Sequence, residues 1–153
     1  MNLSDLFKNA YLVSVVSAWL LAQIIKIFTG YFNGGKFSFV KFFSGTGGMP
    51  SSHSATVMAL FTTCVIRDGL ASYNMAASLL LAIIVMSDAT GVRYETGKQA
   101  KIINELVKEI FSGKANDFNK NLKTLIGHTP LQVIVGALLG VGVGFLINLV
   151  VIK

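Results

Sequence analysis

Long stretches of this sequence carry no charged side chain, and this feature restricts the fold more than any other. A helix needs about 20 apolar residues to cross the hydrocarbon core of a bilayer, with a range of about 17 to 25. Charged residues make up only 13% of the chain, against about 25% in soluble domains, which is too few for a water-soluble globule. Asp, Glu, Lys and Arg are absent from residues 9–25, 42–66, 69–87 and 124–152.

The uncharged windows predict an all-α integral membrane helical bundle that forms one domain over residues 1–153. In the last window Gly136, Gly140 and Gly144 recur at every fourth residue and predict a smooth stripe for close helix packing. The transmembrane helices are expected at residues 10–29, 53–67, 70–90 and 130–151.

The charged residues gather mainly in the connection at residues 91–128. Within it, residues 98–111 have apolar side chains at a 3.6-residue period, which predicts an amphipathic surface helix. The single cysteine, Cys64, excludes an intramolecular disulfide and a Cys-based zinc site. In so apolar a chain, the net charge of +6 indicates contact with a membrane surface rather than nucleic acid.

The positive charge is distributed unevenly across the predicted membrane. With four spans, ten of the thirteen Lys and Arg residues lie on the side that holds both long connections. Cytoplasmic loops carry an excess of Lys and Arg. We therefore expect a multi-pass protein of the cell membrane whose long connections are cytoplasmic and whose two termini face outward.

The chain has two histidines, and both lie where a predicted span begins on the side of the long connections. His53 follows Ser51 and Ser52 in a glycine-rich segment, and His128 follows Gly127. Helix N-termini offer unbonded N–H groups and a positive dipole end, and hydroxyls add donors, so this pattern suits phosphate. The alternative is that the serines only cap a helix.

Four further polar residues are candidates for the same site. Asp88 ends an apolar run, where an ionisable group is costly; alternatively it is an exposed carboxylate at a helix end, paired with Arg93. Arg93 can bind phosphate bidentately, and Lys98 can act as a point charge or as a membrane anchor. Lys26 either turns towards the site or extends its ammonium to the interface.

These segments resemble the type-2 phosphatidic acid phosphatase and vanadium haloperoxidase superfamily, and more closely its divergent bacterial and plant branch. Residues 47–55 resemble the Pro-Ser-Gly-His block, and residues 127–140 resemble the His-x-x-x-Asp block with its following helix. Residues 88–100 are similar to a block peculiar to the divergent branch. The three blocks occur in order and cover about a third of the chain.

The resemblance implies a role for each matched residue. His128 would be the nucleophile that takes the phosphoryl group, and His53 would protonate the leaving oxygen. Ser51 and the backbone N–H of Ser52 would hold phosphate oxygens. An imidazole that attacks phosphorus gives a phosphohistidine, which water then hydrolyses, and this chemistry requires no metal or other cofactor.

The sequence also departs from the superfamily pattern. Gln132 stands where the superfamily has an aspartate that orients the nucleophilic histidine. A Lys followed by Arg-Pro is not found in full, although Lys26 is the best match for its lysine, and the Ser-Arg before the nucleophile is replaced by residues 121–123. Arg93 and Lys98 are candidates to replace the missing cations.

The predicted function is a metal-independent membrane phosphatase that hydrolyses a lipid phosphate monoester or diphosphate, such as phosphatidylglycerol phosphate or phosphatidic acid. Its partners would be that substrate and membrane lipids, not nucleic acid, and the sequence leaves open whether it forms a homo-oligomer. The alternative is a non-catalytic membrane scaffold or lipid-phosphate-binding protein. A small transporter is disfavoured, because the ionisable residues gather at one face.

Overall fold

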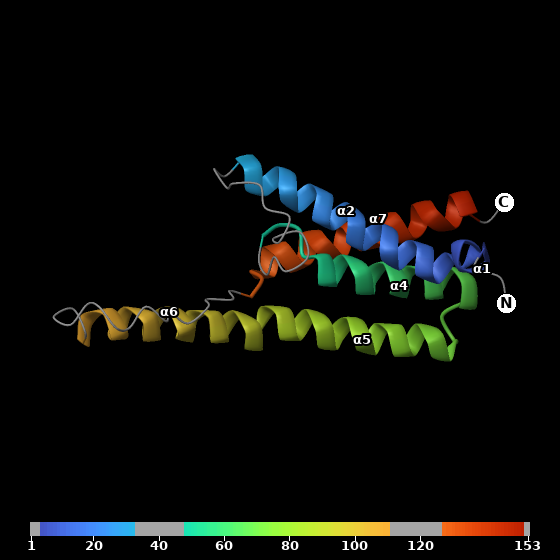
Figure 1. Ribbon diagram of the computed structural model, residues 1–153. Coiled ribbons are helices and arrows are strands. Elements are labelled where there is room, and N and C mark those ends of the chain that lie inside the picture. The colour runs from blue at the N-terminus through green and yellow to red at the C-terminus, as the bar shows by residue number, and fades with distance from the viewer. Residues whose placement is uncertain (1–3, 33–47, 111–126, 152–153) are drawn as a thin grey trace.

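The computed structural model describes residues 4–32, 48–110 and 127–151 of the chain. Every regular element within these ranges is an α-helix, so the all-α prediction is confirmed for the described part. Figure 1 shows α2, α4 and α7 packed together, with α5 alongside them. The helices are α1 (Ser4–Lys8), α2 (Ala10–Phe32), α4 (Ser52–Asp68), α5 (Tyr73–Thr90), α6 (Val92–Ile110) and α7 (Pro130–Val151).

Three helical segments of the described chain are long and apolar enough to cross a membrane. They are Ala10–Thr29, Tyr73–Val107 and Pro130–Val150. Large aliphatic side chains such as Leu80, Ile84 and Leu138 are exposed on them, as expected for surfaces that meet lipid. The protein is therefore a helical membrane protein.

The remaining predicted span, at residues 53–67, corresponds to α4, and it differs from the other three. The helix has 17 residues, about 26 Å at 1.5 Å per residue, which is short for a bilayer core. It packs against α2, α5 and α7, and its buried residues are mainly small or hydroxyl-bearing, among them Ala55, Ala59 and Thr63. A helix enclosed by other helices does not need large apolar side chains, so α4 is the central helix of the bundle.

The amphipathic helix predicted at residues 98–111 is the later part of α6, which already begins at Val92; residue 111 lies outside the described ranges. Ile102, Ile103 and Leu106 are exposed, as the periodicity indicated. Figure 1 shows α6 continuing almost in line with α5 and extending beyond the end of the bundle.

The glycine stripe of α7 faces α4, as its spacing indicated. A methyl group at Gly136 would overlap the carbonyl oxygen of Ser51, and one at Gly140 would overlap that of Ala55. A methyl group at Gly144 would lie 2.8 Å from Cβ of Thr62. The absence of side chains therefore lets the two helices approach until their backbones touch.

Replacing Gly140 by alanine is expected to destabilise the protein by about 1–3 kcal/mol, because the added methyl group has to displace α4 backbone. Gly142 is the matched control, since a methyl group there meets no atom within 4 Å. Gly142→Ala should unfold at the wild-type temperature or slightly above it. Thermal unfolding in one detergent compares the variants, and equal midpoints would contradict the close α4–α7 contact.

A buried polar cluster joins the same helices farther from the start of α4. Asn148 Nδ2 donates to Thr63 Oγ1 at 3.0 Å and to the Gly144 carbonyl oxygen at 2.7 Å. Arg67 Nε donates to Asn148 Oδ1 at 3.0 Å, and Thr63 Oγ1 lies 2.9 Å from Ser14 Oγ. Polar contacts of this kind link α2, α4 and α7 in an apolar environment and fix their relative rotation.

Candidate active site

The first residues of α4 and α7 lie side by side at one end of the bundle, next to the last turn of α5 (Figure 1). The Ser51 N–H donates to the carbonyl oxygen of Gln132 at 3.0 Å, which joins α4 to α7. The His128 N–H donates to the carbonyl oxygen of Ala89 at 3.1 Å, which joins the segment before α7 to α5. Three segments distant in sequence therefore hold one another at the position where the histidines were predicted to meet.

The two histidines are neighbours in space. Their ring centroids lie 6.3 Å apart, and the ring planes are tilted by 59°. His128 is buried, with 5% of its surface exposed, whereas His53 is exposed in the first turn of α4. The sequence expectation that both rings belong to one site agrees with this geometry.

Gln132 and Thr129 fix the protonation of the His128 ring. Gln132 Oε1 accepts the Thr129 N–H at 3.1 Å and also lies 3.2 Å from His128 Nδ1. Because an oxygen can only accept, Nδ1 must carry the proton in this contact. The neutral ring then has its lone pair on Nε2, which is the form a nucleophilic imidazole needs.

Lys26 reaches the start of α4 from α2. Its Nζ donates to Ser52 Oγ at 3.3 Å, and the residue is half-buried. Gly48 leaves room for this side chain, since a methyl group there would lie 3.1 Å from Cγ of Lys26. The φ of Gly48 is 86°, a conformation that favours glycine. Of the two alternatives for Lys26, the structure has the one in which it turns towards the site.

Ser51 is the N-cap of α4, so the capping interpretation is confirmed for this residue. Its Oγ accepts the Ser54 N–H at 3.4 Å and the Ser54 hydroxyl at 3.0 Å. Ser51, Ser52 and Ser54 are all buried. A cap of this kind leaves the hydroxyl proton of Ser51 for a further acceptor, so capping and anion binding are compatible at this position.

Asp88, Arg93 and Lys98 were also predicted to belong to this site, and the structure brings only part of this group to it. Asp88 is half-buried in the last turn of α5, one residue before the carbonyl that holds His128. Arg93 is the second residue of α6, and its side chain lies outside what the structure describes. Lys98 is an exposed residue of α6, with Nζ 2.9 Å from Glu95 Oε1 and 4.4 Å from the Tyr94 ring centroid, both within the same helix. The expected convergence of Lys98 on the histidines is therefore not found.

Three residues that shape the site were not among those singled out from the sequence. Ala89 and Thr129 act through backbone groups. Nearly every residue type has the same backbone carbonyl and N–H, so the sequence does not reveal such a role. Gly48 had a signal, because it stands in a glycine-rich segment before the serines. Its role beside Lys26 depends on a contact between segments that are distant in sequence, and such a contact cannot be predicted from the spacing of residues.

The assembled groups are suited to phosphoryl transfer. The rings of His53 and His128 lie 6.3 Å apart, which is the scale of one phosphoryl group, and the Lys26 ammonium and the N-terminus of α4 lie beside them. Among the described residues, no group of three His, Cys, Asp or Glu could hold a metal ion.

The chain is similar to known proteins over most of its length. Residues 7–143 match the family described as the Divergent PAP2 family. The uncharacterized membrane protein YuiD of Bacillus subtilis (strain 168) is 41% identical over 147 residues, which cover 90% of this chain and 92% of that protein. No solved structure matches the chain.

Proposed function

Because the chain belongs to the divergent PAP2 family, we propose that it is a metal-independent membrane phosphatase that hydrolyses a lipid phosphate monoester or diphosphate. The observation that carries the proposal is the 6.3 Å approach of His53 and His128 at the start of two helices. A site at the end of a membrane-embedded bundle suits a substrate whose head is in water and whose chains are in lipid.

The proposed reaction has two steps. His128 Nε2 attacks phosphorus in line and forms an N–P bond, while the bond from phosphorus to the lipid oxygen breaks and His53 gives that oxygen a proton. Water then attacks the phosphohistidine, His53 takes a proton from the water, and the N–P bond breaks to release phosphate.

Positive groups around the phosphate would stabilise the transition state. In this proposal the equatorial oxygens would accept hydrogen bonds from the Lys26 ammonium, the Ser52 hydroxyl and the N–H groups that begin α4. Ser51 contributes a hydroxyl from the cap, and Arg93 is a further candidate for this role. Asp88 supports the site from the end of α5.

We further propose that this site faces the cytoplasm from the cell membrane, because a topology of four spans would put ten of the thirteen Lys and Arg residues on its side. This orientation favours substrates such as phosphatidylglycerol phosphate or phosphatidic acid over lipid diphosphates displayed outside. A reporter fused after Lys153 should then report an outward C-terminus, and a cytoplasmic signal would reverse the assignment.

A lipid-phosphate-binding scaffold is the second candidate, and Gln132 favours it. The amide orients His128 as described above, but it offers a neutral acceptor where the superfamily has a carboxylate. A neutral partner stabilises the charge that develops on the imidazole less than a carboxylate does. Phosphate release from lipid in mixed micelles by the purified chain separates the two candidates.

Replacing Gln132 by glutamate keeps the reach of the side chain and adds the missing charge. Turnover of a lipid phosphate should rise about five- to tenfold, which is the difference between a neutral and a charged hydrogen bond. Gln132→Asp restores the superfamily residue and should change turnover in the same direction. Steady-state phosphate release measures the effect. A fall in turnover in both variants would show that Gln132 does not assist a nucleophilic His128.

A further inference from the structure

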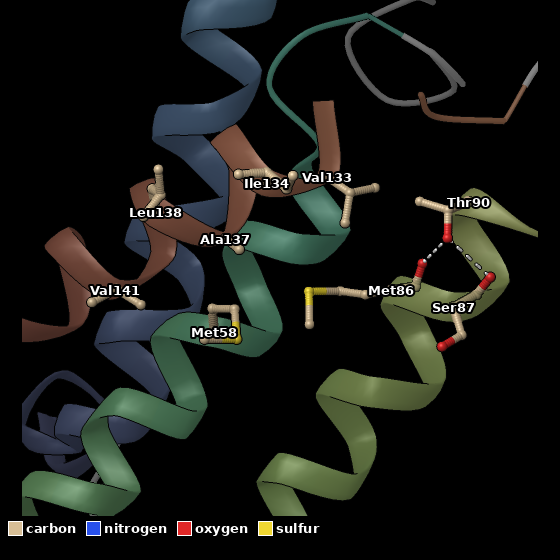
Figure 2. A pocket seen from close by; sticks show the side chains of 9 residues that line it. All are labelled: Met58, Met86, Ser87, Thr90, Val133, Ile134, Ala137, Leu138 and Val141. Carbon is tan, nitrogen blue, oxygen red and sulfur yellow. Dashed lines mark hydrogen bonds between the residues drawn. The ribbon is translucent and has the colours of Figure 1, made fainter. Parts of the chain in front are cut away.

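An apolar groove of about 430 Å³ opens between α5 and α7. Figure 2 shows its walls, with Met58 from α4 at the base, Met86 on the α5 side and Ala137 on the α7 side. Ile134 and Leu138 are 56% and 67% exposed, so the rim is open to the surroundings of α7. In a membrane those surroundings are lipid chains.

At one end of the groove, a lining residue on each wall is next in sequence to a residue that contacts His128. On α5, Thr90 follows Ala89, whose carbonyl oxygen holds the His128 N–H. On α7, Val133 follows Gln132, whose Oε1 contacts His128 Nδ1. The hydroxyl of Thr90 donates to the Met86 carbonyl oxygen, as drawn in Figure 2. The groove thus begins beside the two residues that contact His128 and is lined by apolar side chains along α7 towards Val141.

We propose that this groove holds a hydrocarbon chain of the lipid whose phosphate lies between His53 and His128, an inference that rests on the proposed function. The occupant follows from the continuity with the site, the apolar lining and the opening towards lipid. Met58 and Met86 are unbranched and adapt to a flexible chain. The volume lies within the range of small-molecule sites.

The groove contributes orientation rather than transfer free energy. A lipid chain is already in hydrocarbon, so its move from bilayer to groove gains little from the hydrophobic effect. A seated chain instead fixes where the ester oxygen meets the histidines, and misplacement by about 1 Å can cost on the order of 100-fold in rate. The groove should therefore affect long-chain substrates and leave a short soluble phosphate unaffected.

The test fills the groove with Ala137→Trp and compares two substrates, a long-chain lipid phosphate in mixed micelles and a soluble aryl phosphate. The ratio of lipid to aryl kcat/KM should fall on the order of 10- to 100-fold. Met86→Trp fills the groove from the opposite wall and should lower the same ratio. It replaces Ala137→Trp in the test if that variant does not fold. Ala77→Trp is the matched control, because it fills a groove of about 370 Å³ beside Tyr11 and Cys64. An unchanged ratio in both groove variants overturns the proposal.

A binding measurement separates this inference from the proposed activity. A lipid phosphate with a photoreactive group near the end of its chain should label wild-type peptides that contain Met86 or Ala137, and Ala137→Trp should lose that label. Labelling without phosphate release would contradict the phosphatase and retain the groove. Phosphate release with labelling that Ala137→Trp leaves unchanged would contradict the groove and retain the phosphatase.

Discussion

His128→Ala is expected to abolish phosphate release from lipid and from aryl phosphates alike. In the proposed reaction the imidazole nitrogen of His128 forms the N–P bond. Removal of a covalent nucleophile commonly lowers the rate by several orders of magnitude. The loss should be independent of the leaving group, because no phosphoenzyme forms with either substrate. Phosphate release from both substrates, measured in one detergent, gives the result.

The phosphoenzyme itself provides the control. Rapid acid-free quenching of wild type during turnover of a labelled substrate should leave label on the peptide that contains His128, and His128→Ala should leave none. His128 is buried, but its backbone N–H can still donate to the Ala89 carbonyl oxygen in the variant. We therefore expect the variant to fold, and an unchanged unfolding temperature would show that the bundle is intact. Unchanged lipid phosphatase activity in His128→Ala would exclude the phosphohistidine mechanism and leave the binding scaffold as the better interpretation.

Sequence patterns predicted the helices well because lipid exposure demands apolar side chains. The uncharged windows near Ala10 and Pro130 appear as long apolar helices. The role of α4 was harder to predict, since its window is uncharged for a different reason. Its residues are small because α7 and α2 lie against them, and an absence of charge does not distinguish burial in protein from burial in lipid.

The sequence allowed prediction of those site residues whose role depends on the chemistry of their side chains. His53, His128 and Ser52 were recognisable from their position at helix starts, and they lie together. The position of Lys98 could not be predicted from sequence, because it depends on the direction of α6. That helix extends away from the bundle (Figure 1), and Glu95 then offers Lys98 a partner one turn away.

The glycine stripe connects the fold to the chemistry. Gly136 lies against the backbone of Ser51, which precedes Ser52 and His53 in the first turn of α4. The Ser51 N–H in turn bonds to the Gln132 carbonyl oxygen. The same close approach that joins α4 to α7 therefore sets the distance between His53 and His128, and any side chain at residue 136 should alter the site before it alters the rest of the bundle.

His53→Ala should separate substrates by their leaving groups. A lipid alkoxide is a poor leaving group and needs a proton, so its hydrolysis should fall by roughly 10²- to 10⁴-fold, the usual contribution of general acid catalysis. An aryl oxide leaves without a proton, and its hydrolysis should fall much less. His53 is exposed in the first turn of α4, so its replacement should not unfold the protein. A loss of activity on the lipid substrate alone would therefore not be explained by misfolding.

The ratio of lipid to aryl kcat/KM is the measurement, taken for wild type, His53→Ala and His53→Gln in the same micelles. Both variants lose the acid, whereas His53→Gln keeps a polar side chain of similar size, so both ratios should collapse together. An equal loss on both substrates would assign His53 to phosphate binding, because a lost binding contact weakens every phosphate alike. Activity unchanged on both would remove His53 from the reaction and contradict the two-histidine mechanism.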